Sequence, residues 1–104
     1  MSVDLSPRPA QVTVVHSPAC HFCDDAENAL YAMSTEYAME ISVVYIDSPA
    51  GAELVARHRP AMNPLVLVDG EFFSSGRLPR KKLVKVLERR QLRLASADVV
   101  ATER

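Results

Sequence analysis

The feature that most constrains the fold is a strand, a helix and a second strand in the first half of the chain. Residues 11–16 are rich in β-branched side chains and end at a Ser-Pro pair, which is typical of a strand that stops at a turn. From Phe22 to Met33, apolar residues recur mostly three or four positions apart and predict one face of a helix. Residues 41–46 form a second strand pattern, at a distance that allows a crossover helix. Together these elements predict a parallel βαβ unit.

The second half of the chain predicts a short helix, a hairpin and a last helix. A helix over residues 50–58 follows a Ser-Pro pair suited to a helix start. Residues 65–68 and 71–73 flank Asp69-Gly70, a pair that favours a two-residue type I′ turn and hence an antiparallel hairpin. Pro79 can begin a last helix that extends to about Gln91. The predicted order is therefore β-α-β-α-β-β-α, an α/β fold.

Length and composition restrict the class of protein. A chain of 104 residues fits one domain, for which we expect a leader over 1–10, a domain over 11–91, and a helix end with a frayed tail over 92–104. The formal charge of -1 does not favour a nucleic-acid binder. The chain contains neither an apolar run long enough for a membrane helix nor a secretory signal pattern. We therefore expect a cytoplasmic protein, without a membrane or nucleic-acid partner, and a monomer.

Both cysteines of the chain lie in one motif, Cys20-His21-Phe22-Cys23, at the junction of the first strand and the first helix. A disulfide that encloses two residues adds little stability through loop entropy, so a structural staple is the weaker interpretation. Redox chemistry is the stronger one. Two inert buried helix cysteines remain an alternative. A zinc site that combines the two cysteines with His16 and His21 is a second alternative. A structural zinc ion needs four converging ligands, and the chain has no second Cys-x-x-Cys or His pair, so no metal is predicted.

The ordered set of motifs resembles the thioredoxin-fold proteins, and within them the glutaredoxin-like branch, over residues 11–91. The matching segments are the strand at 12–15, the turn from Ser17 to Cys23, the Asn63-Pro64-Leu65-Val66 segment and the Asp69-Gly70 hairpin. The resemblance implies a central mixed four-stranded sheet flanked by helices. It also implies a cis peptide bond before Pro64.

The position of the motif predicts its chemistry. Unpaired amides and the positive dipole end at a helix N-terminus stabilise a thiolate, and cysteines in such motifs can have pKa values of roughly 3.5–7.5. Because thiolate is the attacking species, Cys20 is predicted to be the nucleophile. Cys23 lies one helical turn on, so it can resolve a mixed disulfide formed at Cys20.

Further residues are candidates for substrate binding. His21 can donate a hydrogen bond or positive charge to the neighbouring sulfur, and Phe22 can contact a bound substrate; a solvent-facing spacer and simple packing are their alternatives. By resemblance, the backbone of Asn63 beside Pro64 pairs with an extended thiol substrate. The segment Ser74-Ser75-Gly76-Arg77, after the last predicted strand, stands where glutaredoxins carry a Gly-Gly then Asp segment for glutathione, so Ser75, Gly76 and Arg77 are candidates. Arg77 can meet a carboxylate or simply be solvated.

The sequence thus predicts a small thiol-disulfide oxidoreductase that reduces or exchanges disulfides. Its expected substrates are disulfide-containing proteins or small thiols, and its electron donor would be a flavin-dependent reductase or a low-molecular-weight thiol. No cofactor is expected beyond such a thiol co-substrate, for example glutathione or mycothiol. Eight basic residues and one acidic residue over 77–93 could steer an acidic partner. A non-catalytic thioredoxin-fold binding or metal-binding module is the alternative.

Overall fold

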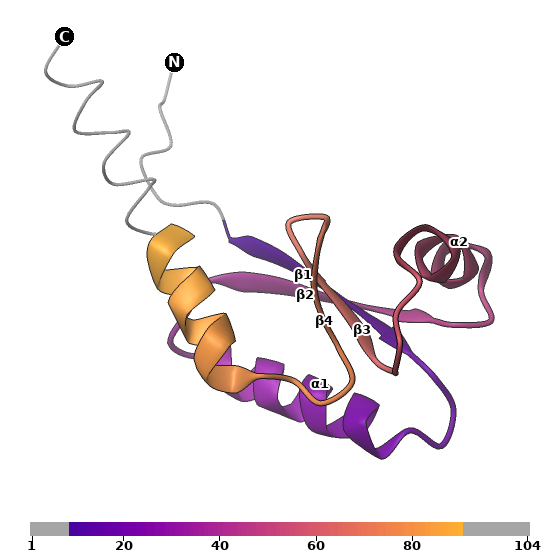
Figure 1. Cartoon of the computed structure of the whole chain (residues 1–104). Coiled ribbons are helices and arrows are strands. Elements are labelled where there is room, and N and C mark those ends of the chain that lie inside the picture. Colours follow the sequence, from indigo (N-terminus) through magenta and orange to yellow (C-terminus); the bar gives the residue numbers. More distant parts are fainter. Residues whose placement is uncertain (1–8, 91–104) are drawn as a thin grey trace, which may run out of the picture.

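The computed structural model describes residues 9–90, which form one open sheet with helices against both of its faces (Figure 1). The elements are β1 (Ala10–His16), α1 (His21–Met33), β2 (Met39–Tyr45), α2 (Pro49–His58), β3 (Leu65–Val68) and β4 (Glu71–Ser75). A last helical segment follows over residues 80–90. The predicted order of elements and the α/β thioredoxin-like arrangement are therefore confirmed.

The sheet is mixed, with the strand order β2-β1-β3-β4. β1 pairs in parallel with β2, so β1, α1 and β2 form the predicted βαβ unit. β3 runs antiparallel to both β1 and β4. Because β1 lies inside the sheet and ends at His16, the turn that carries the two cysteines leaves from a strand that is held on both sides.

Alternation along the strands divides the apolar side chains between two layers. Val12 and Val14 of β1 face one side, where they pack with Leu30 of α1 and Leu83 of the 80–90 segment. Val15 faces the other side and packs with the two leucines of β3 and with side chains of α2. Figure 1 shows the same division, with α1 and the 80–90 segment on one face of the sheet and α2 on the other. Burial of both faces is what a three-layer α/β domain requires.

α2 covers only one end of its face of the sheet, and the side chains of that face explain why. At the far end Gln11 pairs with Glu40, and their side chains form a hydrogen bond of 2.8 Å in an exposed position. A polar surface of this kind gains nothing from a covering helix. At the near end α2 approaches β2 so closely that a Cβ atom at Gly51 would overlap the carbonyl oxygen of Tyr45. Glycine is therefore required where α2 docks.

The hairpin between β3 and β4 has the predicted turn and an unpredicted bulge. Asp69 and Gly70 have φ values of 52° and 82°, and two positive φ angles are what a type I′ turn needs. The pairing shifts between Val66 and Leu67, which leaves Phe73 as an extra residue in β4. A bulge turns two successive side chains the same way, and both Phe73 and Ser74 are buried.

The boundaries of three strands differ from the predicted ones. β1 begins at Ala10, whose side chain is completely buried, one residue before the predicted start. β2 covers 39–45 rather than 41–46, because Met39 and Ile41 pack against the main core. β4 extends through Ser75 instead of ending at Phe73. Most of the predicted leader and all of the predicted tail fall outside the described residues. Among residues 9–90, every helix is too short or too polar to cross a lipid bilayer.

Candidate active site around Cys20 and Cys23

Cys20 is the N-cap residue of α1. Its backbone is extended, with φ -107° and ψ 106°, and its Sγ accepts a hydrogen bond of 3.1 Å from the backbone amide of Cys23. The sulfur therefore takes the place that an oxygen of Ser or Asp fills at most helix starts. An amide at a helix N-terminus stabilises negative charge. Ala19 turns the chain into this cap with a φ of 53°, after Pro18 has interrupted the strand.

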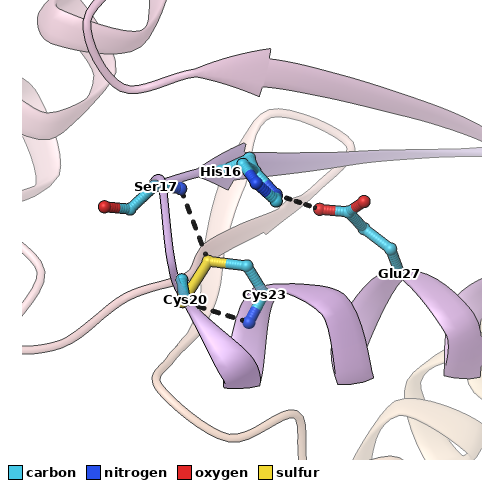
Figure 2. The surroundings of a disulfide bond; sticks show 5 residues. All are labelled: His16, Ser17, Cys20, Cys23 and Glu27. Carbon is cyan, nitrogen blue, oxygen red and sulfur yellow. Dashed lines mark hydrogen bonds and ion pairs between the residues drawn. A yellow bond between two sulfur atoms is a disulfide. The ribbon is translucent and has the colours of Figure 1, made fainter.

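The two cysteines form a disulfide, with their Cα atoms 5.2 Å apart, and their environments differ (Figure 2). Cys20 is partly exposed, whereas Cys23 has an exposed fraction of 0%. The sulfur of Cys23 accepts a hydrogen bond of 3.5 Å from the backbone amide of Ser17, the residue that follows β1. Cys20 therefore lies partly at the surface, whereas Cys23 is shielded from an incoming molecule.

Sheet pairing brings a second predicted segment to the same end of the sheet. The antiparallel register pairs Val15 with Leu65, so Pro64, the residue before Leu65, lies beside the end of β1 and the turn that carries Cys20. The Asn63–Pro64 peptide bond is cis, as the resemblance implied. Asn63 is partly buried and Pro64 is buried.

The segment after β4 joins the same end. Ser75 pairs with Leu65, and the amide of Gly76 donates a hydrogen bond of 3.0 Å to the carbonyl of Pro64. Ser75 is thus a residue of β4 itself, not of the loop after the strand, because the bulge lengthens β4. Gly76 has a φ of 90°, and a Cβ atom there would come within 3.3 Å of the side chain of Met62.

The remaining predicted residues lie on the surface. His21 and Phe22 are exposed in the first turn of α1, with their ring centroids 6.0 Å apart. Arg77 is exposed and lines a shallow surface cavity with the start of the 80–90 segment, where Arg80, Lys81 and Lys82 make the rim basic. No contact joins Arg77 to the disulfide among the interactions of the described residues. Its part in a thiol site remains a prediction.

A polar pair beside the disulfide was missed by the sequence analysis. His16 Nδ1 lies 2.6 Å from a carboxylate oxygen of Glu27, and both side chains are only 19% exposed. Figure 2 shows this pair next to the disulfide, on the same side of α1. A signal did exist, because Glu27 lies four residues after Cys23 and so on the same side of α1, next to the buried Ala26 and Leu30. An acidic residue there needs a partner.

One set of side chains within residues 9–90 has the composition of a partial metal site. Ligand-type atoms of His16, Asp24 and Glu27 lie within 4.8 Å of one another. A structural zinc ion uses four ligands, and the two nearby sulfur atoms are bonded to each other. The set shares only His16 with the zinc site weighed from the sequence.

Comparison with known proteins agrees with this geometry. No curated protein sequence matches the chain. A family model described as glutaredoxin-like domain (DUF836) matches residues 11–88, a span that runs from β1 through β4 into the last helical segment. The match includes the helix-capping Cys20, the buried Cys23 and the cis Pro64. The chain therefore belongs to the glutaredoxin-like DUF836 family.

Proposed function

We propose that this protein is a thiol-disulfide oxidoreductase in which Cys20 attacks and Cys23 resolves. The observation that carries the proposal is the asymmetry of the pair. Cys20 is partly exposed and its sulfur is held by an amide at the start of α1, whereas Cys23 is fully buried. A redox-active pair needs one sulfur that meets the substrate and one that is close but shielded.

The reaction consists of two exchanges. In the reductive direction, the thiolate of Cys20 attacks one sulfur of the substrate disulfide; a mixed disulfide forms and the other substrate sulfur leaves as thiolate. The thiolate of Cys23 then attacks Cys20 Sγ, which closes the Cys20–Cys23 disulfide and releases the second substrate thiolate. The substrate gains two electrons and the protein loses two. Two thiols, from one dithiol donor or from two monothiol molecules, must return them.

The surface around Cys20 supports disulfides of proteins or small thiols as substrates. Exposed Phe22 and Met62 offer apolar contact, and the loop that contains Asn63 offers backbone groups beside the cis Pro64. The basic rim that includes Arg77 suits a carboxylate of a low-molecular-weight thiol such as glutathione or mycothiol. Such a thiol, or a flavin-dependent reductase, would supply electrons. We propose action in the cytoplasm, as a monomer that needs no resident cofactor.

Trapping tests the proposed function directly. Cys23→Ser should accumulate a mixed disulfide through Cys20 when it is mixed with a protein disulfide or an oxidised small thiol, because the second exchange cannot occur. Cys20→Ser is the matched control, since it keeps one cysteine and should form no adduct. Mass spectrometry under non-reducing conditions detects the adduct. A Cys23→Ser protein that forms no adduct with any disulfide would refute catalysis and favour a non-catalytic binding module.

A further inference from the structure

The His16–Glu27 pair joins the two elements that hold the disulfide. His16 is the last residue of β1, and Glu27 lies in the second turn of α1. Their 2.6 Å contact is the only ion pair between these two elements among residues 9–90. It is mostly shielded, since each side chain is 19% exposed, and a shielded contact to a charged group is stronger than an exposed one.

The next residue along the chain contacts the resolving sulfur. The amide of Ser17 donates to Cys23 Sγ, so the position of this amide depends on how the end of β1 sits against α1. Glu27 lies one helical turn beyond Cys23, on the same side of α1. The pair and the sulfur contact are therefore two adjacent links between the same two segments, as Figure 2 shows.

We propose that His16 and Glu27 are positioning residues for the second exchange. Their contact holds the end of β1 against α1, so that the Ser17 amide is directed at Cys23 Sγ after the disulfide has opened. This amide stabilises the thiolate of Cys23 when that thiolate attacks the mixed disulfide at Cys20. The first exchange, by Cys20, does not use the contact, because its sulfur is held by the Cys23 amide instead.

This inference rests on the proposed redox function, and an aryl disulfide separates the two steps. Reduced protein mixed with excess dithiobis(nitrobenzoate) releases one coloured thiolate when Cys20 attacks. It releases a second when Cys23 attacks the mixed disulfide at Cys20 and closes the protein disulfide. Stopped-flow absorbance gives both rates in one trace. Cys23→Ser should show the first release only, which assigns the phases.

Glu27→Ala should slow the second release about tenfold, the effect of about one lost net hydrogen bond on a rate, and leave the first release unchanged. Glu27→Gln keeps an oxygen that accepts from Nδ1, and His16→Asn keeps a nitrogen donor near the same place. Each of these two variants should therefore keep most of the wild-type rate of the second release. Asp25→Ala is the matched control, because it removes a carboxylate of α1 that is paired with Arg80 at 3.1 Å and lies two residues from Cys23, on another side of the helix.

The outcomes distinguish the two proposals. An unchanged second rate in a folded Glu27→Ala protein would overturn the positioning role while leaving the redox function intact. Equal slowing of both releases would also overturn it, because that result indicates general damage to the protein. Slowing in Glu27→Gln as large as in Glu27→Ala would overturn it too, because that result indicates a role of charge alone. Wild-type protein that releases no thiolate through Cys20 would instead refute the redox function. Circular dichroism checks the fold of each variant. Should Glu27→Ala fail to fold, His16→Ala provides the test, because it removes the same contact from the side of β1 and should slow only the second release.

Discussion

After reduction, alkylation of the two cysteines should be strongly selective for Cys20. Cys23 reacts only when the start of α1 opens, because its side chain is completely buried and its sulfur is hydrogen-bonded to the Ser17 amide. Burial of a small apolar side chain contributes about 1–2 kcal/mol, and a net hydrogen bond about 1 kcal/mol. Exposure of Cys23 therefore costs roughly 2–3 kcal/mol, which predicts that Cys20 reacts roughly 30- to 150-fold faster.

A time course with iodoacetamide measures this ratio. Protein is reduced, alkylated at neutral pH, quenched at intervals and digested, and mass spectrometry counts the label on each cysteine. The same experiment in concentrated urea is the control, because the ratio should approach one when the fold that buries Cys23 is lost. Equal rates in the folded protein, or faster modification of Cys23, would refute the argument from burial.

Three other predictions concern the scaffold. Gly51→Ala should lower the free energy of unfolding by about 1–3 kcal/mol, because the added Cβ atom meets the carbonyl of Tyr45; an unchanged urea midpoint would contradict the close docking of α2. Leu30→Ala should cost about 2–5 kcal/mol in the same assay, because Leu30 is completely buried in the main core, and a loss below 1 kcal/mol would place Leu30 outside it. Desolvation, followed by the charge of Glu88, raises the pKa of Tyr37 above its ordinary value of 10.0. Glu88→Gln should move the ultraviolet titration of Tyr37 to lower pH, and a titration that does not move would exclude the Glu88 carboxylate as a cause. In the wild-type protein, the free energy of unfolding should fall as pH rises through 10.0, because the unfolded state loses the Tyr37 proton first.

Local chemistry explains why much of the fold could be predicted. The β-branched run at 11–16 and the Asp69-Gly70 pair encode a strand and a turn through their own backbone preferences, and both occur where expected. The capping position of Cys20 likewise follows from a strand that stops just before an amphipathic helix. These features need only short stretches of chain.

Contacts between distant segments could not be predicted in the same way. The His16–Glu27 pair depends on how β1 lies against α1, which no spacing specifies. The bulge that places Ser75 inside β4 arises from packing of the hairpin against the core, because an unbroken alternation would not bury both Phe73 and Ser74. Leu54 of α2 is only half-buried, because α2 covers one end of its face of the sheet.

The two ends of the described chain lie together and far from the cysteines. Arg90 donates a hydrogen bond of 3.3 Å to the carbonyl of Pro9, just before β1 starts. The helix α1, which Cys20 caps, begins past the other end of that strand (Figure 1). A seven-residue strand is roughly 20 Å long. A fusion partner, an affinity handle or a solid support joined directly at Pro9 or Arg90 would therefore be attached about one strand length away from Cys20. The domain can be anchored there, or joined to a second module, with the Cys20–Cys23 disulfide past the opposite end of β1.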